Sequence, residues 1–209
     1  MAEARFFIMR HGETVYNAGG RLQANHIHTP LTRRGVEQAL RMGEVLKGAL
    51  GESPAATLHV SAAGRALQTA ALIAEVMGLD WFAARRTTAL HEIDMGSWCE
   101  RTYADVEAEH GRIVDADHLL TPAPDGESYP AIAARLQGWL EHVGDAPGNH
   151  IVVMHGLSSR VLRGMMTGLP AHAAYGVPIA PSLPQGSIAV VTGRREDIIF
   201  RPQSGNERA

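Results

Sequence analysis

The chain has a single cysteine, a single lysine and no long apolar run. The lone Cys99 excludes an internal disulfide and a zinc site built from cysteines. A net charge of −3 provides no basic field for nucleic acid. No apolar stretch is as long as a membrane span, and residues 1–10 carry no signal-peptide pattern. We therefore expect a cytoplasmic protein with no nucleic-acid or membrane partner.

Length and composition favour one globular domain over residues 1–209, because 45% of the residues are hydrophobic. Residues 205–209 are expected to form a frayed tail. Lys47 is the only lysine among 19 basic residues. Such an arginine bias is typical of a GC-rich genome, so the number of arginines does not indicate a phosphate site. Only the positions of particular arginines can do so.

Strand-like and helix-like segments alternate along the chain. The expected strands are 6–9, 57–61, a piece near 81–82, 150–154, 187–192 and 198–201. The expected helices are 31–50, 64–77 and 157–167, with Thr32 as the N-cap of the first and Gly78 ending the second. Val36, Ala39, Leu40, Gly43, Leu46 and Leu50 are predicted to line the buried face of the first helix. This alternation predicts an α/β fold with a largely parallel sheet.

Chemically active side chains follow four of these segments. Arg10 and His11 follow the first strand, and Arg65 opens the helix after the second. Glu92 lies just beyond residues 88–90, and His155 follows the 150–154 strand. Ligands bind at such strand ends in open α/β sheets, and free N–H groups at helix N-termini favour anions. The pattern therefore indicates a phosphate site.

Several motifs in this order resemble the histidine phosphatase superfamily, branch 1, the phosphoglycerate mutase-like family. The matching pieces are R-H-G-E-T at 10–14 with Asn17, R-L-Q at 21–23, P-L-T-R-R-G at 30–35, S-A-A-G-R-A-L-Q-T-A at 61–70, L-H-E at 90–92, G-S-W at 96–98, D-G-E-S at 125–128 and V-V-M-H-G at 152–156. The resemblance covers nearly the whole chain. It implies a three-layer α/β/α sandwich with a mostly parallel central sheet.

The resemblance also implies a phosphohistidine mechanism. A neutral His11 would attack phosphorus, with its second ring nitrogen bonded to the Gly12 carbonyl. Arg10, Arg65 and a protonated His155 would surround the phosphate oxygens. One such charge pair at about 4 Å stabilises by on the order of 4 kcal/mol at an effective dielectric near 20. Neither a metal nor any other cofactor is then expected.

Other residues are expected to assist this chemistry. Asn17, Gln23 and the Gly156 N–H are further candidate phosphate contacts. Glu92 is the preferred acid for the leaving group and the base for the water, with Glu13 as its rival. Glu127 and Ser128 are expected to shape the substrate rim, and residues 93–130 are a candidate lid or substrate loop.

Departures from the family pattern lie on the substrate side. Cys99-Glu100 stand where many relatives carry Glu-Gly, Ala24 replaces the usual glycine after Gln23, and His28 replaces a frequent aspartate. The mutase branch also carries E-R-H-Y-G and a following Asn-Lys, which this chain lacks. The chain is therefore predicted to be a phosphomonoester hydrolase acting on a small phosphorylated metabolite.

Three alternatives stay open at this point. The first is a cofactor-dependent phosphoglycerate mutase, and the second is a non-catalytic phospho-ligand binder. The third is a metallohydrolase that uses extra histidines such as His26 and His28, although no third ligand lies at metal-site spacing. The substrate and the assembly state, including a homodimer, are also open.

Overall fold

The computed structural model describes residues 3–24, 26–144 and 146–202. The expected tail at 205–209 lies outside these ranges. The described residues contain a sheet of six strands in the order β3-β2-β4-β1-β5-β6. The strands are β1 (Ala4–Arg10), β2 (Ala56–Ser61), β3 (Arg85–Thr87), β4 (Gly148–Met154), β5 (Ile188–Thr192) and β6 (Arg195–Phe200).

The sheet is mostly parallel, as predicted. β1 pairs with β4, β4 with β2, and β2 with β3, all in parallel, whereas β5 and β6 are antiparallel additions beside β1. Residues 6–9 of β1 and 151–154 of β4, the two central strands, are apolar and buried, because helices cover both of their faces. Their C-terminal ends, at Arg10 and Met154, lie in register.

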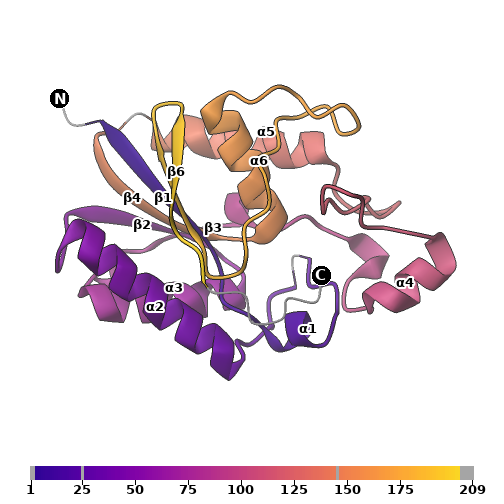
Figure 1. Cartoon of the computed structure of the whole chain (residues 1–209), viewed down its shortest axis with the longest axis horizontal. Helices are drawn as coiled ribbons and strands as arrows, with labels where there is room; N and C mark the ends of the chain where they lie inside the picture. Colours follow the sequence, from indigo (N-terminus) through magenta and orange to yellow (C-terminus); the bar gives the residue numbers. More distant parts are fainter. Residues whose placement is uncertain (1–2, 25, 145, 203–209) are drawn as a thin grey trace.

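Helices cover both faces of the sheet and confirm the three-layer arrangement (Figure 1). The helices are α1 (Val15–Ala18), α2 (Arg33–Leu50), α3 (Gly64–Met77), α4 (Tyr103–His110), α5 (Tyr129–Val143) and α6 (Gly156–Thr167). Phe7 and Met9 of β1 pack toward α2 and α3, whereas Phe6 and Ile8 pack toward α5 and α6. This alternation is the two-residue period of a strand that is covered on both sides.

Two expectations about local structure were wrong. Residues 81–83 form a 3-10 helix rather than a strand, and Phe82 is 90% exposed. The neighbouring strand is β3, which begins at Arg85. In α2, Ala39, Gly43 and Leu46 are buried as expected, and Leu50 packs against the core while partly exposed. Gln38 and Met42 are buried in place of Val36 and Leu40, so the buried face is rotated about the helix axis.

Residues 93–130, the candidate lid or substrate loop, contain the helix α4 and the start of α5. Thr102 caps α4, and Ser128 caps α5, whose Ile132, Leu136 and Trp139 are buried. α4 and α1 lie at the same end of the molecule, where Arg21 forms a bridge with Thr102 (Figure 1). Among the described helices, none is long and apolar enough to cross a membrane.

Two buried histidines face each other beneath α5. His59 Nε2 lies 3.2 Å from His150 Nδ1, and His150 Nε2 lies 2.9 Å from the Ala146 carbonyl oxygen. Because a carbonyl only accepts, His150 carries its proton on Nε2 and receives the second bond from His59. Burial, with smaller effects of His150 and Arg85, lowers the pKa of His59 to about 4.

This pair predicts acid sensitivity of the fold. A histidine in the unfolded chain has a pKa of about 6.5. Below that pH the native state therefore binds fewer protons than the unfolded chain. The free energy of unfolding should therefore fall, by at most about 3 kcal/mol from this residue, as the pH drops from about 6.5 to about 4. Urea unfolding of wild type and His59→Gln at several pH values measures this. The glutamine side chain can still donate to His150 but does not titrate. An equal loss of unfolding free energy at acid pH in both proteins would contradict the prediction.

Candidate active site

The four predicted strand ends meet at one edge of the sheet. His11 directly follows β1 and donates its backbone N–H to the Met154 carbonyl oxygen over 3.0 Å. His155 directly follows β4, and the two imidazole rings lie 5.2 Å apart in an edge-on arrangement. Both rings are buried, with 3% and 0% of their surfaces exposed. The carboxyl ends of neighbouring parallel strands therefore bring these two histidines together.

Arg65, in the first turn of α3, lies between the two imidazoles. Its Nε–H is 3.2 Å from His11 Nε2 and 3.1 Å from His155 Nδ1. The rest of the guanidinium donates to the backbone carbonyls of Ala24 and His26 and to the Thr29 hydroxyl. Burial lowers the pKa of Arg65 to about 10, so this 1%-exposed side chain stays cationic at neutral pH.

The protonation of both histidines follows from these partners. A guanidinium has only donors, so the imidazole nitrogens that face Arg65 must accept. His11 then carries its proton on Nδ1, which lies 2.7 Å from the Gly12 carbonyl oxygen. His155 carries its proton on Nε2, which lies 2.7 Å from Ser61 Oγ. The two rings are thus held as opposite tautomers.

Electrostatics keep both imidazoles neutral in the empty site. Burial, followed by the charges of Arg65 and Arg10, lowers the pKa of His11 well below its usual range. Burial and Arg65 also lower the pKa of His155 well below its usual range. The protonated His155 that the resemblance implied is therefore not the form of the empty site, and a proton would have to arrive with an anion.

Arg10 and Gly156 lie against each other where β1 meets α6. A Cβ on Gly156 would lie 3.1 Å from Arg10 Cζ, so a larger residue there would push the guanidinium back by a few tenths of an ångström. Arg10 also donates from a terminal nitrogen to the Leu183 carbonyl oxygen over 3.3 Å. The N-terminus of α6 and the Arg10 cation thus face the same region.

The two rival glutamates occupy different places. Glu92 accepts hydrogen bonds from the backbone N–H groups of Leu157 and Ser158 at 3.0 and 2.8 Å, which holds it at the start of α6 beside His155. Glu13 instead bonds the Thr32 hydroxyl at 2.8 Å and lies 3.4 Å from Arg34, at the start of α2. This placement favours Glu92 for chemistry and Glu13 for support.

Asn17 and Gln23 lie in the loop after His11, around Thr14. The Thr14 hydroxyl is 2.7 Å from Gln23 Oε1 and 2.9 Å from Asn17 Oδ1, and Gln185 donates to the same Asn17 oxygen over 2.6 Å. These contacts fix the loop and do not join either side chain to the pair of histidines. Their role as phosphate ligands stays a prediction.

Several residues that hold the site had no role assigned from the sequence. Thr69 accepts the Gly12 N–H over 3.1 Å and so helps to position Gly12, whose carbonyl accepts from the His11 ring. Arg135 of α5 pairs with Glu127 at 2.7 Å and donates to the Ala89 carbonyl, behind Glu92. Thr69 lies within the 61–70 motif that carries the family resemblance, so the sequence contained a signal for its role. Arg135 lies in a helix that was not predicted.

The loop that presents His11 also depends on a close contact with α2. A Cβ on Gly35 would overlap the backbone carbonyl oxygen of Glu13, and one on Gly12 would overlap the Gly35 carbonyl. Only a pair of glycines allows the two backbones to approach this closely. The R-H-G and L-T-R-R-G motifs are therefore two sides of one packing contact.

The chain belongs to branch 1 of the histidine phosphatase superfamily, whose family model matches residues 6–200. The "Probable phosphoglycerate mutase GpmB" of Cronobacter sakazakii is 35% identical over 177 residues, covering 80% of this chain and 76% of that protein. A mycobacterial glucosyl-3-phosphoglycerate phosphatase, solved in complex with VO3, is 27% identical with a TM-score of 0.74, covering 93% and 97% of the two chains. The α-ribazole phosphatase of Shigella flexneri shares the fold, with 22% identity, a TM-score of 0.71 and coverage of 93% and 94%.

Replacing Gly35 by alanine tests the close contact. We expect Gly35→Ala to lower the free energy of unfolding by about 1–3 kcal/mol, because the new methyl group must displace the loop that carries His11. Gly48→Ala is the matched control in the same helix, since nothing lies within 4 Å of a Cβ there. It should raise stability by about 0.5–1 kcal/mol. Urea unfolding measures both, and equal effects of the two substitutions would contradict the packing contact.

Proposed function

We propose that this protein is a metal-independent phosphomonoester hydrolase that forms a phosphohistidine on His11. The observation that carries the proposal is the sharing of one Arg65 N–H between His11 Nε2 and His155 Nδ1. This arrangement gives a neutral imidazole whose Nε2 lone pair is unprotonated and faces a buried cation. Such a pair is what nucleophilic attack on a phosphate dianion requires.

In the first step His11 Nε2 would attack phosphorus while the ester oxygen leaves. Gly12 holds the Nδ1 proton, so the attacking lone pair lies on Nε2. Arg65, Arg10 and the Gly156 N–H supply positive charge and donors for the phosphate oxygens. Because phosphoryl transfer depends mainly on positioning and charge stabilisation, these groups can act without further covalent machinery.

Glu92 would supply the proton that the leaving alkoxide needs. Its hydrogen bonds to Leu157 and Ser158 hold the carboxyl group in place next to His155. In the second step the same group, then a carboxylate, would take a proton from the water that attacks phosphohistidine. Release of inorganic phosphate would restore neutral His11.

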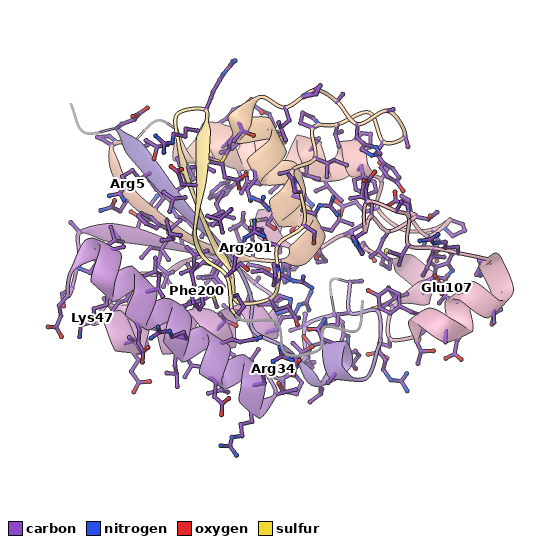
Figure 2. All side chains as sticks on the ribbon, in the orientation of Figure 1. Arg5, Arg34, Lys47, Glu107, Phe200 and Arg201 are labelled. Atoms are coloured by element: carbon purple, nitrogen blue, oxygen red, sulfur yellow. The ribbon has the colours of Figure 1, made fainter. Side chains whose placement is uncertain are left out.

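Phosphoglycerate mutase activity is the second candidate, because relatives at 31–35% identity are named probable phosphoglycerate mutases. In a mutase the phosphohistidine returns its group to an acceptor hydroxyl instead of water. Two features of this chain favour water over an acceptor hydroxyl as the group that receives the phosphoryl group. Lys47, its one lysine, lies in the last turn of α2 and pairs with Glu52 (Figure 2), whereas the loop of His11 contacts Gly35 in the first turn. The Glu100 carboxylate bonds His26, next to the segment that holds Arg65, and would repel a substrate carboxylate.

A direct test uses p-nitrophenyl phosphate in excess EDTA. We expect the wild type to release inorganic phosphate at an unchanged rate, and His11→Ala to lower kcat by at least about 1,000-fold. His142→Ala, an exposed histidine of α5, is the matched control and should keep wild-type activity. Circular dichroism checks that each variant is folded.

The same preparation separates the two candidates. With 3-phosphoglycerate and a trace of 2,3-bisphosphoglycerate, a hydrolase releases stoichiometric phosphate and forms no 2-phosphoglycerate. Formation of the isomer without phosphate would overturn hydrolysis in favour of the mutase. Turnover of p-nitrophenyl phosphate by His11→Ala at the wild-type rate would remove His11 as the nucleophile.

The role of Glu92 predicts a dependence on the leaving group. Glycerol phosphate needs a proton on its departing oxygen, whereas p-nitrophenolate leaves without one. We expect Glu92→Gln to lower kcat/KM for glycerol phosphate by about 100-fold or more, and for p-nitrophenyl phosphate by less than about 10-fold. Steady-state kinetics with both substrates measure this. If both values fell equally, the acid would lie elsewhere.

A further inference from the structure

Ser61, the last residue of β2, has a direct contact with one of the two histidines. Its Oγ lies 2.7 Å from His155 Nε2, and both residues are fully buried. On the other side of the same ring, Arg65 Nε lies 3.1 Å from Nδ1. Both ring nitrogens of His155 are therefore held by residues of one short segment, 61–65.

The chemistry of the partners fixes what each contact does. Arg65 can only donate, so Nδ1 accepts and Nε2 carries the proton of the neutral ring. The Ser61 oxygen is then the acceptor of a buried N–H. Without that oxygen, the tautomer with its proton on Nε2 would lose its partner, while the tautomer with its proton on Nδ1 would face Arg65. Removal of the hydroxyl would thus loosen the ring at both nitrogens.

We propose that Ser61 is a positioning residue for His155, which holds Nε2–H so that Nδ1 is presented to the phosphate. This inference rests on the proposed hydrolase function and adds a residue that acts through His155. When a phosphate monoester binds as its monoanion, Nδ1 would take the proton of the phosphate and donate it back as a hydrogen bond to a phosphate oxygen. The Arg65 N–H that faced Nδ1 would then donate to the phosphate instead. The Ser61 oxygen supports the resulting imidazolium, because hydrogen bonds from charged donors are stronger than those from neutral ones.

The surroundings of His155 explain why such support is needed. Burial is the first cause that disfavours a positive charge on His155, followed by Arg65 of α3, His11, His91 and Arg135 of α5. The facing carboxylate is Glu92, which bonds the first turn of α6 next to this ring. The bound phosphate supplies the negative charge, and the Ser61 oxygen is a fixed acceptor that does not depend on the substrate.

The test compares three substitutions at one position. We expect Ser61→Ala to lower kcat for p-nitrophenyl phosphate by about 10–100-fold while KM changes less. The basic limb of its kcat–pH profile should move to lower pH by about half a unit to one unit, because the imidazolium has lost its acceptor. Ser61→Thr keeps the hydroxyl and should recover most of kcat. Ser61→Cys keeps the size with a weak acceptor and should stay slow.

Thr167→Ala is the matched control, since it removes a hydroxyl at the far end of α6. Its kcat and pH profile should equal those of the wild type. Urea unfolding shows whether each Ser61 variant is folded. A Ser61→Ala protein that is folded and keeps the wild-type kcat and pH profile would overturn the proposal, as would a Ser61→Cys protein as fast as wild type.

A second readout does not depend on turnover. Nitrogen-15 and proton NMR of the imidazoles, without phosphate, should show His155 protonated on Nε2 in both the wild type and Ser61→Ala, because Arg65 still donates to Nδ1. The Nε2–H proton signal should move upfield and exchange faster with water in Ser61→Ala, because the acceptor of that proton is gone. An Nε2–H signal that is identical in both proteins would overturn the role of Ser61 even in an active enzyme. If the wild type released no phosphate, the hydrolase function would fail, while the NMR measurement would still decide the contact.

Discussion

The buried guanidinium of Arg65 is the interaction on which the site depends. A cation in the interior is expensive unless every donor finds a partner. Here the partners are two imidazole nitrogens, the carbonyls of Ala24 and His26, and one hydroxyl. The same side chain therefore fixes the tautomers of His11 and His155 and the path of the loop after residue 23. A lysine could not replace it, because a point charge with three donors cannot span these acceptors.

This arrangement places cations beside two imidazoles that do not carry a positive charge. Burial and Arg65 favour the neutral form of His11 and His155, so the proposed nucleophile would have its lone pair available before a substrate binds. A phosphate anion would favour protonation of His155, because it would bring negative charge next to a ring whose Nε2–H already has an acceptor. The preference for an anion is therefore built into groups that are already in place, which lowers the reorganisation needed during reaction.

The sequence predicted well those features that depend on residues close together along the chain. β1, β4 and α3 follow from buried apolar runs, and Gly78 ends α3 in the left-handed conformation, as expected. β3 was misplaced because Arg85–Thr87 shows no apolar pattern at the end of the sheet, while Trp81 and Phe82 imitate a strand. The contact between Ser61 and His155 joins residues 94 positions apart, so no local pattern could reveal it.

Two departures from the family pattern show how specificity can change while the chemistry is kept. Ala24 and Glu100 stand where glycine is usual, and both retain the left-handed backbone that favours it, with φ of 48° and 69°. That conformation costs a non-glycine residue about 1 kcal/mol. At Ala24 the carbonyl is still aimed at Arg65. At Glu100 the change adds a carboxylate that bonds His26 and Tyr16. The backbone carbonyl that accepts from Arg65 is thus preserved, and a carboxylate that a glycine would not supply stands beside His26.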